Sequence, residues 1–125
     1  LKALEIYNQL LEISANKPAQ YFRIQYLRGL TLEKLPDPEN PTQTRLGDAL
    51  SAYFSVLDRP IDPAPPEWEW FERSGFRALT ILENAQRWPA AISIAEKIAS
   101  FRGPRAEEAA TRARQLRLKH MIWED

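Results

Sequence analysis

Residues 67–103 read EWEWFERSGFRALTILENAQRWPAAISIAEKIASFRG, and the spacing of their apolar residues indicates the class of fold. In both halves, apolar or small residues recur every three or four positions, which is the period of an amphipathic helix. In the first half they are Trp68, Phe71, Gly75, Ala78, Leu79 and Leu82. In the second they are Ala91, Ile92, Ala95, Ile98 and Ala99. The pattern predicts a helix that follows Pro66 and another over 88–101, which Gly103 closes before Pro104 opens the next.

The same period continues on both sides of this stretch. It predicts further helices over 1–14, 18–35, 44–57 and 105–122, with Asn16 and either Thr42 or Thr44 as candidate N-caps. The links PDPENPTQ (36–43) and PIDPAPP (60–66) hold too many prolines to be helical, and we expect the first to be exposed. No segment alternates apolar and polar residues as a half-buried strand does. We therefore predict one all-α domain of six helices over residues 1–125.

Composition excludes several classes of protein. The 125 residues are 44% apolar and 27% charged, as in ordinary globular domains, and 17 basic residues balance 17 acidic ones. With zero net charge, the protein as a whole is not attracted electrostatically to nucleic acid or to an anionic membrane. There is no cysteine and one histidine, which excludes cysteine-based zinc sites and any site that needs two histidines, and no apolar run approaches the roughly 18 residues of a membrane span. A chain without cysteine suits cytoplasm and periplasm alike, so the compartment stays open.

Two of the predicted helices share a local pattern. The third contains Ala49, then Tyr53 four residues later, with Pro60 just past its end, and the fifth contains Ala91 and Ala95 with Pro104 beyond. An alanine, a residue four positions on and a terminating proline resemble the second helix of a tetratricopeptide repeat. In the first helix of each unit this family has a small residue that permits close approach, and the candidates are Gly29 in one unit and either Gly75 or the Ala78–Leu79 pair in the other.

The resemblance implies a fold and a type of function. It implies three antiparallel helical hairpins stacked as a short α-α superhelix, with the last helix as a solvating cap. The units differ from the family's period of about 34 residues, because Ala49 and Ala91 are 42 positions apart and 36–43 supplies extra length. It also implies a non-catalytic scaffold for protein–protein interaction, with the first helix of each hairpin lining a concave groove. We expect the domain to form the C-terminal part of a longer, bacterial protein.

The residues that could carry catalysis have structural explanations. His120 has no second histidine or cysteine beside which it could bind a metal, and it suits the C-terminal end of a helix. Acidic pairs occur at 67–72 and 107–108, within the first turns of predicted helices, where the dipole favours carboxylates. No phosphate-binding loop or nucleophile elbow is present. We predict that the protein is not an enzyme and uses no metal or cofactor.

The best binding signal is a set of arginine and aromatic residues off the core-facing positions of the second and fourth helices. Planar cations beside aromatic surface suit recognition of a protein segment. The candidate groove residues are Arg23, Tyr26, Trp70, Arg73, Phe76 and Arg77. Because these side chains lie off the core, we expect Arg77→Ala to leave the free energy of unfolding within about 0.5 kcal/mol of the unmodified protein. For Trp70 the alternative is packing beneath the proline-rich link 60–66.

Charge is distributed unevenly and leaves two alternatives open. Residues 31–72 hold nine acidic and three basic residues, whereas 102–120 hold six basic and two acidic ones. Ordinary solvation of a capping helix and two loops explains this asymmetry, and the alternative is that it sets the register of weak self-association within a larger protein or docks an acidic partner. The basic last helix could also bind nucleic acid, although no aromatic residues are interleaved with it for base stacking.

Overall fold

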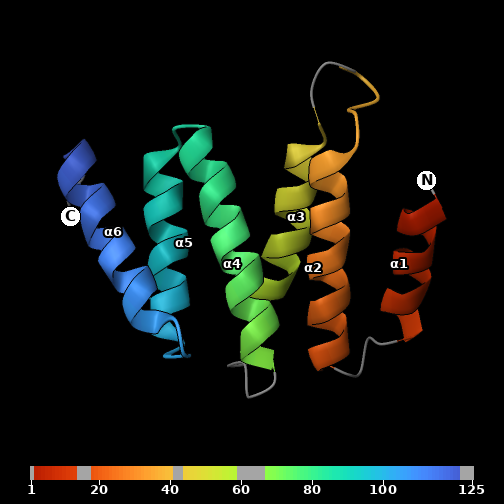
Figure 1. Ribbon diagram of the computed structural model, residues 1–125, viewed down its shortest axis with the longest axis horizontal. Coiled ribbons are helices and arrows are strands. Elements are labelled where there is room, and N and C mark those ends of the chain that lie inside the picture. The colour runs from red at the N-terminus through yellow and green to blue at the C-terminus, as the bar shows by residue number, and fades with distance from the viewer. Residues whose placement is uncertain (1, 14–17, 41–43, 59–66, 122–125) are drawn as a thin grey trace.

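The computed structural model describes residues 2–13, 18–40, 44–58 and 67–121 (Figure 1). Within these ranges the chain forms six helices and no strand beyond an isolated bridge between Pro36 and Thr44. The helices are α1 (Lys2–Ile13), α2 (Pro18–Lys34), α3 (Leu46–Leu57), α4 (Glu67–Asn84), α5 (Trp88–Ser100) and α6 (Ala106–His120). The prediction of an all-α chain of six helices is confirmed, with boundaries within about two residues of those expected.

The helices stand in a row and alternate in direction, so that each is antiparallel to the next (Figure 1). Each helix packs on its neighbours in sequence, which agrees with the expected stack of helical hairpins. In addition α2 packs directly on α4, past the intervening α3. This contact between non-consecutive helices brings together side chains from two different parts of the sequence.

Two of the described helices have a proline in their first turn. Pro18 begins α2, and Pro89 lies in the first turn of α5. The residue before α3 is Arg45, which makes no side-chain capping hydrogen bond, so the expected cap by Thr44 is wrong. Instead, the Arg45 Nε donates to Asp48 at 2.7 Å, and its backbone N–H donates to the Leu35 carbonyl at 3.0 Å. The other expected cap residues, 16 and 42, and Pro66 lie outside the described residues.

Two glycines allow the helices to approach closely. A Cβ at Gly29 of α2 would lie 2.6 Å from the Cζ of Tyr53 on α3, and one at Gly75 of α4 would lie 2.7 Å from the Cδ1 of Ile98 on α5. Both distances are too short for real atoms, so the rings and methyl groups of the partner helix fill the space that a side chain would need. Ala49 and Ala91 are fully buried, as expected for helix–helix contacts.

The turn between α5 and α6 differs from the expected one. Arg102, not Gly103, adopts the left-handed conformation, with φ of 57°. A Cβ at Gly103 would lie 2.8 Å from the Oε2 of Glu72 on α4, so this carboxylate lies close against the Gly103 backbone. That oxygen accepts a hydrogen bond from the backbone N–H of Arg105 at 2.7 Å, just before α6 begins. Glu72, which lies in the second turn of α4, therefore caps the N-terminal end of α6.

The ends of the row differ in character. On α6 the buried residues are Ala109, Ala113 and Leu116, and the ring of His120 stacks on Trp88 of α5 at 3.7 Å between ring centroids. His120 thus has a structural contact that fastens the end of α6. Helix α1 has no buried residue.

Candidate binding surface

An aromatic–arginine cluster joins α2 and α4. Trp70 of α4 lies 5.9 Å from the ring of Tyr26 on α2, measured between centroids. The guanidinium groups of Arg23 on α2 and Arg73 on α4 lie 5.9 and 5.3 Å from the centre of the Trp70 ring. Both distances are within the range of cation–π attraction. Tyr26 and Trp70 are half-buried, whereas the two arginines are exposed, so the cluster presents a rigid aromatic base beneath solvated cations.

A second group of polar side chains continues this surface along α2 and α4. Tyr26 also lies 6.2 Å from the ring of Tyr53 on α3, whose hydroxyl donates a hydrogen bond to Glu33 of α2. Arg77 of α4 donates to the same carboxylate through Nη2 and through Nε, the latter at 3.1 Å. Burial, together with the hydrogen bond to the carboxylate, raises the pKa of the Tyr53 hydroxyl well above its usual range, and the carboxylate raises the pKa of Arg77. The Glu33 carboxylate therefore connects α2, α3 and α4 through hydrogen bonds.

The structure brings four of the six predicted groove residues together and separates two. Arg23, Tyr26, Trp70 and Arg73 form the cluster, while Arg77 belongs to the adjoining ion pair with Glu33. Phe76 faces the other way, toward the start of α6, where the Arg105 guanidinium lies 3.8 Å from its ring centre. The Trp70 ring contacts Tyr26 and the guanidinium groups of Arg23 and Arg73. The link 60–66, which was the alternative partner, lies outside the described residues.

An apolar pocket adjoins the cluster between α1 and α2. It has a volume of about 310 Å³ and shares Arg23 with the cluster. The residues that line it are Tyr7, Leu10, Gln20, Arg23, Ile24 and Leu27. The pocket and the cluster therefore form one surface, apolar at the α1 side and aromatic at the α4 side.

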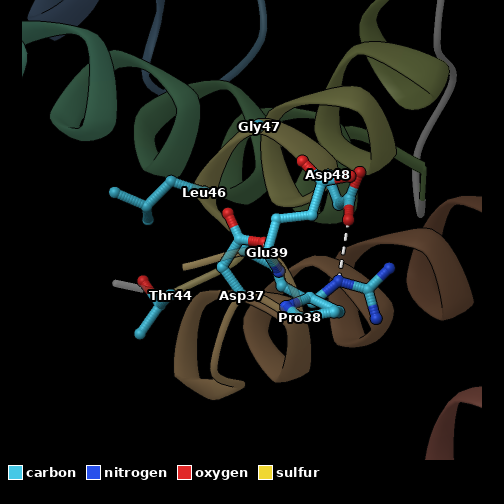
Figure 2. Close-up of a pocket in the computed structure, with 8 residues that line it drawn as sticks. Asp37, Pro38, Glu39, Thr44, Leu46, Gly47 and Asp48 are labelled. Carbon is cyan, nitrogen blue, oxygen red and sulfur yellow. Dashed lines mark hydrogen bonds and ion pairs between the residues drawn. The ribbon is translucent and has the colours of Figure 1, made fainter. Parts of the chain in front are cut away.

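A second hollow, of about 370 Å³, lies where the link after α2 meets the start of α3 (Figure 2). Its acidic residues are Asp37, Glu39 and Asp48, and the dashed line in Figure 2 marks the bond from Arg45 to Asp48. Within the described ranges no group of three carboxylates or histidines is arranged to hold a metal ion. Residues 36–40 of this link are non-helical and largely exposed, as expected, and 41–43 lie outside the described residues.

The basic last helix is partly neutralised by its neighbours. Arg112 pairs with Glu83 of α4 and Arg117 with Glu96 of α5, each at 2.7 Å. Arg105 pairs with Glu108 at 2.8 Å, and this hydrogen bond lowers the pKa of the Glu108 carboxyl. At least three of the six basic side chains over 102–120 thus carry a carboxylate partner, which reduces the positive charge that α6 offers to a phosphate backbone.

Two features of this surface were not foreseen from the sequence. They are the hydrogen bonds that Glu33 accepts from Tyr53 and from Arg77. Helix spacing places Glu33 on the same flank as Arg23 and Tyr26, and it places Tyr53 in the core, but it names no partner for either residue. The available signal was that Glu33 follows Gly29 by four residues, which is one helical turn, and Gly29 is where the Tyr53 ring packs. The partner on α4 could not be read from spacing, because it lies 44 residues further along the chain.

Comparison with protein-family models, curated proteins and solved structures finds no match to this chain. Among the described helices, none has the length and apolar character needed to cross a lipid bilayer. Function is therefore argued from the geometry of the surface.

Proposed function

We propose that this chain is a tetratricopeptide-like array that serves as a non-catalytic scaffold and binds a segment of a partner protein on the face formed by α2 and α4. The observation that carries the proposal is the aromatic–arginine cluster. Trp70 is held between two arginines and a tyrosine contributed by two non-consecutive helices. Tryptophan, tyrosine and arginine are the residue types most enriched among the anchors of protein interfaces.

The energetics of the cluster favour binding over a purely structural role. Arg73 forms its ion pair with Glu69 of its own helix, and both side chains are about half exposed, so this pair adds little to stability. Arg23 makes no ion pair with any described residue, and its guanidinium lies over the Trp70 ring. Both guanidinium groups can therefore pair with a partner, because neither forms a buried ion pair that stabilises the fold.

The experiment compares the same substitution, arginine to alanine, inside the cluster and on a distant helix. A partner is first captured with the intact protein, purified and confirmed by direct binding. Arg23→Ala and Arg73→Ala should then weaken its affinity by tenfold or more, as expected for interface anchors. Arg114→Ala is the matched control, because Arg114 is exposed on α6 and donates to Thr111 of its own helix. Equal affinity of all three variants would place the site elsewhere.

Self-association is a second candidate, and an observation on α1 favours it. The side chains of Ile6 and Ile13 are 47% and 77% exposed on this end helix. Exposed apolar side chains seven residues apart share one face of a helix, and such faces mark interaction surfaces. At the other end, α6 is mostly polar outside, although Leu118 and Met121 are exposed there. A second copy that covers the α1 face would explain the exposed isoleucines.

Mass measured across a concentration series tests this candidate. Self-association through α1 predicts a mass that rises with concentration and returns to the monomer value in Ile6→Glu. A constant monomer mass for the unmodified protein would contradict self-association. Binding of a partner segment on the α2/α4 face would then be the one proposed function that stands.

A further inference from the structure

The pocket between α1 and α2 has a lining suited to a particular kind of side chain. Its lining includes Leu10, Ile24 and Leu27, together with the aromatic ring of Tyr7. None of the described lining residues is acidic, and Arg23 is the only charged one among them. A pocket of about 310 Å³ with such a lining would accept a bulky aliphatic or aromatic side chain and desolvate it.

The charges around the pocket and the cluster do not cancel. Three arginines lie along this face, at 23, 73 and 77. Two of them have carboxylate partners, Glu69 for Arg73 and Glu33 for Arg77. Among the described residues, the unbalanced charge is that of Arg23, which stands at the junction between the apolar pocket and Trp70. A guanidinium in this position offers paired N–H donors to a carboxylate beside the pocket.

From this juxtaposition we infer that the partner segment is acidic: a bulky apolar residue enters the α1–α2 pocket, and an aspartate or glutamate within one helical turn of it pairs with Arg23. This inference rests on the proposed function and specifies its ligand. The apolar residue supplies most of the affinity through burial, while the carboxylate sets the register against Arg23. Further along the segment, its backbone or an aromatic side chain would lie on Trp70.

A library selection tests the inference without knowledge of the natural partner. Random dodecapeptides displayed on phage are selected against the folded protein, against Arg23→Glu, and against Arg114→Glu as the matched control. We expect the unmodified protein and Arg114→Glu to enrich peptides that combine a bulky apolar residue with a nearby Asp or Glu. Arg23→Glu should enrich Lys or Arg at the same position instead.

One selected peptide is then synthesised for direct binding. Its affinity should fall at least tenfold when its acidic residue becomes the amide, and equally for Arg23→Gln, with no further loss when both changes are combined. Leu27→Gln should also weaken binding at an unchanged circular dichroism spectrum, because it makes the pocket lining polar.

The outcomes separate this inference from the proposed function. Selected peptides that lose affinity with Arg73→Ala but show no acidic preference would overturn the inference and leave the binding face in place. Peptides that are insensitive to both Arg23→Glu and Arg73→Ala, or a complete absence of enrichment, would overturn both.

Discussion

Arg77 of α4 is bound to Glu33 of α2 by two hydrogen bonds that join these non-consecutive helices, and the hydroxyl of Tyr53 on α3 donates to the same carboxylate. The Glu33 side chain is only 12% exposed, whereas that of Arg77 is 42% exposed. A half-solvated cation therefore satisfies a nearly buried anion. The pair therefore links α2 to α4 beside the Trp70 cluster.

Truncation of Arg77 should destabilise the fold, contrary to the expectation from sequence that this residue is solvated. Arg77→Ala leaves the nearly buried Glu33 carboxylate with Tyr53 as its remaining partner among the described residues, and we expect a loss of about 1–2 kcal/mol in the free energy of unfolding. Urea unfolding of the two single variants and of the double variant with Glu33→Ala measures the coupling. Arg73→Ala, which breaks only an exposed ion pair, should stay within about 0.5 kcal/mol of the unmodified protein.

The protonation of Tyr53 should make the fold sensitive to alkali. Its pKa in the folded state lies above the ordinary value of about 10, so the unfolded chain loses this proton first as pH rises. Stability is therefore complete below about pH 10 and falls above it, by up to about 1.4 kcal/mol per pH unit.

The Tyr53→Phe variant isolates this contribution. Unfolding free energies measured between about pH 8 and pH 11 should show the largest stability advantage of tyrosine over phenylalanine below pH 10, shrinking above it. A difference that does not change with pH would show that the hydroxyl titrates equally in the folded and unfolded chains.

Two glycine substitutions should have opposite effects. Alanine at Gly29 would collide with the Tyr53 ring, so Gly29→Ala should destabilise by about 1–3 kcal/mol despite its better helix propensity. A Cβ at Gly47, in the exposed first turn of α3, would have no described atom within 4 Å, so Gly47→Ala should stabilise by up to about 1 kcal/mol. Thermal unfolding of both variants tests this, since the melting temperature should fall for Gly29→Ala and rise for Gly47→Ala. Stabilisation by both would contradict the close approach of α2 and α3.

Removal of the cap that α4 provides for α6 should loosen the end of the row. Glu72→Ala deprives the Arg105 N–H of its acceptor, and we expect a cost of about 1–2 kcal/mol, similar to the loss of an N-cap. Hydrogen exchange of the α6 amides should accelerate more than that of α2. Glu69→Ala is the matched control, since this exposed carboxylate pairs with Arg73 of its own helix, and it should leave α6 protection unchanged.

The helices themselves were predictable because their signals are local. Apolar periodicity and proline positions lie within about 18 residues of one another, and each helix was placed closely from them alone. Leu46 shows where such a pattern misleads, since it follows the apolar spacing of α3 but is 44% exposed in the first turn. The conformation of Arg102 was missed for a related reason: glycine at the next position is the usual left-handed residue, but here that glycine lies against the Glu72 carboxylate and has a negative φ.

The arrangement of the candidate surface was only partly predictable. Arg23, Tyr26, Trp70 and Arg73 share a side of their helices, and helix spacing indicated this correctly. Phe76 follows Arg73 by three residues, so it lies about 60° away around the α4 axis. At this angle its ring contacts Arg105 and not the Trp70 cluster. Long-range partners such as Glu33 for Arg77 depend on how α2 packs on α4, which no local pattern encodes.

The amide NMR spectrum of the protein during titration with a selected acidic peptide tests the binding face most directly. We predict shifts at the amides of α2 and α4 around Arg23, Leu27 and Arg73 and at the indole N–H of Trp70, with α5 unperturbed. Shifts confined to α5, to α6 or to the exposed isoleucines of α1, with Trp70 unmoved, would contradict a binding site on the α2/α4 face.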